Sequence, residues 1–90
     1  MDINDIAVKF EDFKRNIRKH SDIQITDNRE MILDGCRRVI RYDENEICLE
    51  LPTVGIEIVG MMLKMNNFSV GGVIVEGEIH SITFISKEEL

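Results

Sequence analysis

The sequence contains little that would build an aromatic or a covalently cross-linked core. Its 90 residues include no tryptophan, one tyrosine, four phenylalanines, one proline and two cysteines. The core must therefore be aliphatic, built from isoleucine, valine, leucine and the five methionines. Cys36 and Cys48 allow at most one disulfide and form no C-x-x-C motif. Reduced thiols in a cytoplasmic protein are the expected state.

Long apolar segments are also missing. No apolar run approaches the ~20 residues that a transmembrane helix needs. Asp2 and Asp5 stand where a signal peptide would be basic and then apolar, which argues against secretion. Ninety residues make one domain, and we expect no deep active-site cavity in so short a chain.

An excess of basic residues is missing from most of the chain. The net charge is −6. Residues 1–20 hold five basic and four acidic side chains, a charge of +1, whereas residues 21–90 hold six basic and thirteen acidic ones, a charge of −7. An acidic body disfavours nucleic acid as a partner, because phosphates require a basic surface. The asymmetry suggests instead that the N-terminal segment contacts an acidic surface.

Residues 1–21 are predicted to form an amphipathic N-terminal helix, with helical turns over residues 3–19. Apolar side chains recur at spacings of three and four residues, which places them on one face: Ile3, Ile6, Ala7, Phe10, Phe13 and Ile17. A basic cluster occupies the last turns, where positive charge is favourable: Lys14, Arg15, Arg18 and Lys19. We expect the helix to pack on its own chain or on a second copy. The alternative is docking on a partner or a membrane surface, although Glu11 and Asp12 disfavour a membrane.

From Asp22 onward, apolar residues alternate with polar ones, the period of a strand with one buried face. Strands are expected near residues 22–26, 30–33, 38–42, 47–51, 54–59, 61–66, 72–76 and 78–85. Turn signals include a hairpin at Asp34-Gly35 and a polar turn over residues 43–46. Asn66-Asn67 tolerates left-handed backbone, and Gly71-Gly72 does so freely. Because the connections are short, strands adjacent in sequence should pair as antiparallel neighbours.

These patterns predict a mainly β domain over residues 22–86, followed by a tail over residues 87–90. The architecture is either a small antiparallel sandwich or a rolled antiparallel sheet, preceded by the N-terminal helix.

A short strand pattern that ends in glycine appears three times. The copies are MILDG, IEIVG and VIVEG, which end at Gly35, Gly60 and Gly77. Gly55 and Gly72 are 17 residues apart, as Gly60 and Gly77 are, so the second and third copies resemble a repeated two-strand unit. A glycine at a fixed place after a strand marks a turn, a bulge or a close backbone approach. We predict a structural role for the three glycines and a loss of stability when they are replaced.

The sequence contains no convincing catalytic or metal-binding motif. His20, His80 and the two cysteines lack the closely spaced pairs of a zinc site. A calcium loop beginning at Asp43 would need a glycine at its sixth position and a glutamate at its twelfth, and it has neither. Three glutamates lie on predicted strands: Glu57, Glu76 and Glu78. They fit a solvated sheet face better than an acid–base pair. We therefore predict a protein that is not an enzyme and holds no metal and no cofactor.

Three apolar residues fall out of phase with the buried side of their strands: Met61, Leu63 and Ile74. Side chains out of phase would point away from the core, and an outward apolar patch is usually a contact surface. We expect the N-terminal helix to cover this patch, either in its own chain or in a homo-oligomer.

The stretch from Ile23 to Phe84 resembles the YabP/YqfC family of bacterial sporulation proteins. The resemblance is carried by Ile25-Thr26, by GCRRV at residues 35–39, by YDENEI at residues 42–47, and by a series of single positions: Leu49, Thr53, Gly55, Ile56, Ile58, Gly60, Leu63, Met65, Gly72, Val75, Glu76, Gly77 and Ile79. These motifs specify a fold better than a chemistry. The N-terminal extension is similar to that of YqfC-like members, whereas the YabP pattern is shorter, and both subgroups stay open.

The resemblance implies a small β protein made in the mother cell of an endospore-forming bacterium, with a part in building the spore envelope and without catalytic residues. We therefore expect a non-catalytic protein that acts through contacts with protein partners, in the cytoplasm of the mother cell or at the forespore surface. The sequence does not name the partner. The alternative is a peripheral membrane-binding or docking module that uses the basic cluster of the N-terminal helix.

Overall fold

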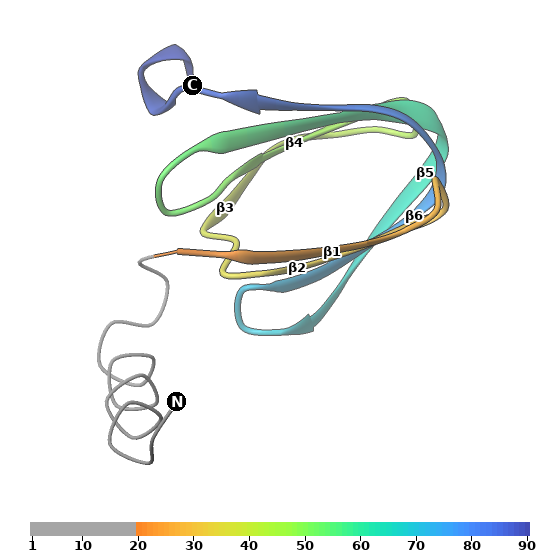
Figure 1. The fold of residues 1–90 in the computed structure, drawn as a ribbon, viewed down its shortest axis with the longest axis horizontal. Helices are drawn as coiled ribbons and strands as arrows, with labels where there is room; N and C mark the ends of the chain where they lie inside the picture. The colour runs from red at the N-terminus through yellow and green to blue at the C-terminus, as the bar shows by residue number, and fades with distance from the viewer. Residues whose placement is uncertain (1–19) are drawn as a thin grey trace, which may run out of the picture.

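The computed structural model describes residues 20–90, and these residues form a six-stranded antiparallel sheet (Figure 1). Its strands are β1 (Asp22–Thr26), β2 (Glu30–Asp34), β3 (Arg38–Tyr42), β4 (Glu46–Glu50), β5 (Gly55–Ser69) and β6 (Gly72–Ile85). A short 3₁₀ helix, η1 (Lys87–Glu89), follows. The strand order is β1-β2-β6-β5-β4-β3. The prediction of a mainly β, antiparallel fold is confirmed, while the helix predicted over residues 3–19 lies outside the described residues.

The sheet is rolled because its two central strands are long and bent. β4 pairs with residues 55–59 of β5, and β2 pairs with residues 72–76 of β6. The second half of each long strand pairs with the first half of the other. In Figure 1 the two strands curve together at one end, with β1 and β2 in the lower layer and β3 and β4 in the upper layer.

The hydrophobic core lies between these two layers. Alternate residues of a strand point to the same face, as the period-two pattern predicts. The buried core consists of Met31, Leu33, Ile47, Leu49, Leu51, Ile56, Ile58, Leu63, Val73, Val75 and Ile79. All of these side chains are aliphatic, in agreement with the composition of the chain.

The structure has six strands where the sequence predicts eight. The strands expected at 54–59 and 61–66 are one strand, β5, and those expected at 72–76 and 78–85 are one strand, β6. The pairing of β5 with β6 shifts register between Val59 and Gly60, and again between Met61 and Lys64 opposite Gly77. Gly60 and Gly77 therefore lie at bulges, which bend two continuous strands without ending them.

The link from β2 to β3 crosses between the layers, and the hairpin predicted at Asp34-Gly35 is wrong. β2 already lies between β1 and β6, so neither of its edges is available to β3. Gly35 has a φ of 98°, and the backbone NH groups of Gly35 and Cys36 donate to the carbonyl oxygen of Gly71 at 3.0 and 2.9 Å. Of the two places expected to tolerate left-handed backbone, Gly71 adopts it in the β5–β6 turn with a φ of 77°, whereas β5 continues through Asn66 and Asn67.

The two halves of the domain repeat one arrangement. Each half consists of a hairpin and a long strand: β1 and β2 with β6, and β3 and β4 with β5. In each half the hairpin turn is bonded to the bulge of its long strand. The backbone NH of Gly60 donates to the carbonyl of Asn45 at 2.9 Å, and that of Gly77 to the carbonyl of Arg29 at 3.2 Å. The 17-residue spacing of the glycines therefore belongs to a three-strand unit, larger than the predicted two-strand one.

Candidate functional site

The bend of β5 places two methionines at an outer corner of the rolled sheet. The Met61 side chain is 50% exposed and that of Met62 is 74% exposed. Met62 has a φ of 53°, in the left-handed region that side chains rarely adopt. We refer to Met61 and Met62 as the methionine corner.

A surface hollow lies on each side of the methionine corner. One hollow, of about 330 Å³, combines both methionines with four charged residues: Arg29, Lys64, Glu76 and Glu78. The other, of about 320 Å³, is lined by Met62 together with Tyr42, Asp43, Glu44, Leu63 and Lys64. Methionine is flexible and polarisable, and it is common at surfaces that adapt to more than one partner. The combination of apolar and charged side chains is typical of a protein-contact surface.

The turn between β3 and β4 holds the methionine corner in place from one side. The backbone NH of Leu63 donates to the carbonyl of Glu44 at 2.8 Å, just after the corner. Just before the corner, Gly60 donates to the Asn45 carbonyl, and the Asn45 side-chain Nδ2 donates to the Gly60 carbonyl at 3.2 Å. Because these bonds lie on both sides of the methionines in the chain, the backbone that presents the two side chains is fixed.

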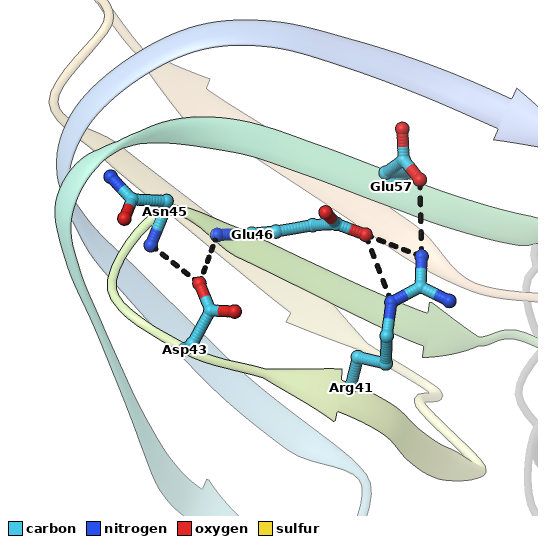
Figure 2. A network of polar contacts seen from close by, with 5 residues as sticks. All are labelled: Arg41, Asp43, Asn45, Glu46 and Glu57. Atoms are coloured by element: carbon cyan, nitrogen blue, oxygen red, sulfur yellow. Dashed lines mark hydrogen bonds and ion pairs between the residues drawn. The ribbon is translucent and has the colours of Figure 1, made fainter.

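Charged side chains also hold the conformation of the turn between β3 and β4 (Figure 2). The Asp43 carboxylate accepts hydrogen bonds from the backbone NH groups of Asn45 and Glu46 at 2.7 and 2.8 Å. The Arg41 guanidinium donates to the Glu46 carboxylate, which raises the pKa of Arg41, and it reaches Glu57 at 3.2 Å. Arg41 thus connects β3, β4 and β5 across the sheet. The predicted polar turn over residues 43–46 is present as the link between β3 and β4.

The structure does not assemble the predicted apolar patch. Met61 is exposed, but the prediction that Leu63 points outward is wrong, because Leu63 is buried in the core. The bulge between Met61 and Lys64 shifts the alternation of β5 and returns Leu63 to the inner face. Ile74 is half-buried and pairs with Ile32, so it lies within the β1–β2 layer and is not part of the corner.

Met62, the more exposed residue of the corner, is missing from the predicted patch. A strict period-two pattern assigns Met62 to the buried face, because it makes no allowance for a bulge. The available signal was the apolar run from Val59 to Leu63, which is interrupted only by glycine and which one face of a regular strand cannot bury.

Two further sets of residues were considered from the sequence. The basic cluster of Lys14, Arg15, Arg18 and Lys19 lies outside the described residues. Cys36 and Cys48 are free thiols, and burial raises the pKa of both, so they are protonated at neutral pH.

The ionisable residues of the described part form no metal centre. Within residues 20–90, no three His, Cys, Asp or Glu side chains come together in a metal-binding group. Glu57 pairs with Arg41, whereas Glu78 lies 3.2 Å from the exposed His80. Over the same residues, no helix has the length and apolarity needed to cross a membrane.

The Glu50 carboxylate gives a pH-dependent contribution to stability. It accepts hydrogen bonds from Arg38 Nη2 at 2.8 Å and Lys87 Nζ at 3.3 Å, and these hold its pKa below the usual value of 4.5. A lowered pKa stabilises the fold above the usual carboxyl range, and the contribution disappears as the pH falls through the lowered pKa. We expect Glu50→Gln to lower the melting temperature slightly at neutral pH. This difference should shrink as the pH falls below 4.5, and a constant difference would contradict the assignment.

Comparisons with known proteins identify the family. The fold and the corner define a small, rolled antiparallel β domain with two exposed methionines at its bend. The model of the YabP family matches residues 17–90, so this chain belongs to the YabP family. Membership indicates a sporulation-related protein. No curated protein and no solved structure matches the chain.

Proposed function

We propose that this YabP-family protein acts without catalysis in assembly of the spore envelope, by binding another protein through the methionine corner. The observation that supports this is the exposure of two methionines on a fixed bend, one of them at a φ of 53°. A left-handed conformation costs a non-glycine residue about 1–2 kcal/mol. Strain of this kind gathers at functional sites, so the cost points to a role for the Met62 side chain.

The residues of the methionine corner indicate what kind of surface the partner presents. Its two hollows accept apolar side chains, with Met61 and Met62 as the apolar contacts. The charged residues nearest to them include both signs, such as Lys64 and Glu76, and favour a polar rim around the contact. Interfaces of this type concentrate their binding energy in a few central side chains. Because the family is related to sporulation, we further propose that this binding takes place in the mother cell and that the partner is a protein of the forming spore.

A complementation experiment tests this function. Deletion of the gene in a sporulating strain is expected to lower the yield of heat-resistant spores, and the unaltered chain should restore it. The double variant Met61→Ser and Met62→Ser should fail to restore the yield while keeping its melting temperature, because both side chains lie outside the core. Val70→Ser is the matched control, since Val70 is also apolar and exposed but lies at the β5–β6 turn. Full restoration by the double variant would reject the corner as the binding surface.

The alternative function, a peripheral membrane module, depends on the basic cluster of residues 14–19. If the cluster docks on lipid, the chain should float with anionic vesicles at low salt and dissociate as salt screens the charges. We expect no flotation, because the segment also carries Glu11 and Asp12.

A further inference from the structure

The rolled sheet has two open sides, and the two sides differ in chemistry. On each side an edge strand of one layer faces the second half of a long strand in the other layer: β3 faces β5, and β1 faces β6 (Figure 1). On the first side, the backbone NH of Met65 in β5 donates to the hydroxyl oxygen of Tyr42 in β3 at 3.0 Å. This hydrogen bond connects the two layers at their edges.

The second side presents exposed apolar residues on the face that carries the core. Ile25 of β1 pairs with Met31, and Phe84 of β6 pairs with Ile56. Met31 and Ile56 are fully buried, and paired residues point to the same face of a sheet. Ile25 and Phe84 nevertheless remain 51% and 62% exposed within the described part of the chain. Both side chains therefore face inward without anything described to cover them.

The internal repeat allows the second side to be compared with the first, position by position. Ile25 is equivalent to Tyr42 in the internal repeat. Ile25 pairs with Met31 of β2 and Tyr42 pairs with Ile47 of β4, and these two paired residues occupy equivalent positions in the two halves. Phe84 occupies the place of Asn67, because the strands correspond at a spacing of 17 residues. Tyr42 and Asn67, which both carry polar groups, thus correspond to the wholly apolar Ile25 and Phe84 on the second side. Neither Ile25 nor Phe84 has a polar group that could connect the layers as Tyr42 does.

We propose that the apolar face of residues 3–17 of the same chain packs over Ile25 and Phe84 and closes this side of the roll. The segment carries Ile6, Phe10 and Phe13 on one face if it is helical. It joins the domain at His20 and Ser21, directly before β1, which forms one edge of the open side. Its length fits as well: the fifteen residues 3–17 span about 22 Å as a helix, and the seven residues 79–85 of β6 span about 23 Å.

Charge supports the same occupant. Residues 1–20 carry +1 and residues 21–90 carry −7, so the segment is attracted to the body of its own chain. β1 and its turn carry the exposed Asp22, Asp27 and Arg29, a net charge of −1 beside the open side. The sequence predicts that the N-terminal helix covers the patch of Met61, Leu63 and Ile74. We propose instead that it covers the edge formed by β1 and β6.

A tryptophan reporter tests the proposal, because the natural chain has no tryptophan. In the full chain, Phe84→Trp should give short-wavelength emission and weak quenching by acrylamide. Adding Phe10→Ser and Phe13→Ser should shift the emission to longer wavelength and increase the quenching several-fold. Tyr42→Trp is the matched control: Tyr42 is an exposed aromatic residue at the equivalent edge on the first side, and its emission should not respond to the two serines.

Two other results would overturn the proposal. If Phe84→Trp is strongly quenched with and without the two serines, the segment does not cover this side. If the protection disappears on dilution, together with a fall in the sedimentation coefficient, a second copy of the chain provides the cover.

Discussion

Replacing Gly60 by alanine is expected to destabilise the domain by more than about 3 kcal/mol, because the added Cβ would collide with backbone. The Cβ would lie 2.0 Å from the carbonyl oxygen of Glu78 and 3.1 Å from the Leu63 side chain. That carbonyl belongs to β6, where the two long strands bend together. Relieving the collision requires the strands to separate at the bend. At about 4–8 °C per kcal/mol, the melting temperature should fall by more than about 12 °C.

Gly55→Ala is the control for this change. Its Cβ would also be too close to another atom, 2.6 Å from Leu90, but that atom is the end of a C-terminal side chain that can rotate away. Thermal denaturation followed by circular dichroism should show a loss within about 1 kcal/mol for Gly55→Ala. Equal losses for Gly55→Ala and Gly60→Ala would show that the bend is not the origin of the effect.

Gly77 is the equivalent point in the other half of the domain. It has a φ of 134°, and a Cβ there would lie 2.7 Å from the carbonyl oxygen of Met62. Both the backbone conformation and the close approach oppose a side chain, so Gly77→Ala should change stability in the same direction as Gly60→Ala.

The burial pattern of the sheet could be predicted from the sequence, but its pairing could not. Ile47 and Leu49 alternate with polar neighbours, and this local signal is enough to place both in the core. The pairing of β2 with β6 joins residues about 40 positions apart, as Leu33 and Val73 show. Nothing local in a strand specifies a partner at that distance. The pairing of β2 with β6 depends on the roll of the whole sheet. The roll follows from bulges that a period-two pattern does not detect.

The same limitation explains the partial prediction of the site. The run from Val59 to Leu63 indicates excess apolar surface near Met61, and the structure confirms that Met61 is exposed. The division of this run into outward and inward side chains depends on the conformation of a single residue. Because Met62 takes a φ of 53°, the strand changes phase within the run, and a period-two pattern contains no sign of that change.

Leu63→Ala should cost about 2–5 kcal/mol, the range for removing a large buried aliphatic side chain. Leu63 packs in the core next to the bend, and its backbone NH is bonded to the carbonyl of Glu44. The neighbouring change Met62→Gly should have the opposite effect on stability. Glycine removes the left-handed strain of about 1–2 kcal/mol. The greater freedom of glycine in the unfolded chain opposes this by about 0.4–1 kcal/mol.

Urea denaturation of the two variants separates structure from function at adjacent positions. Leu63→Ala should lower the urea midpoint clearly, whereas Met62→Gly should leave it unchanged or raise it by the equivalent of up to about 1.6 kcal/mol. If Met62→Gly unfolds as readily as Leu63→Ala, then Met62 is part of the core and the corner is not a contact surface. If Met62→Gly is stable but fails to restore the yield of resistant spores, the strained methionine is retained for binding, because the fold itself would be as stable with glycine.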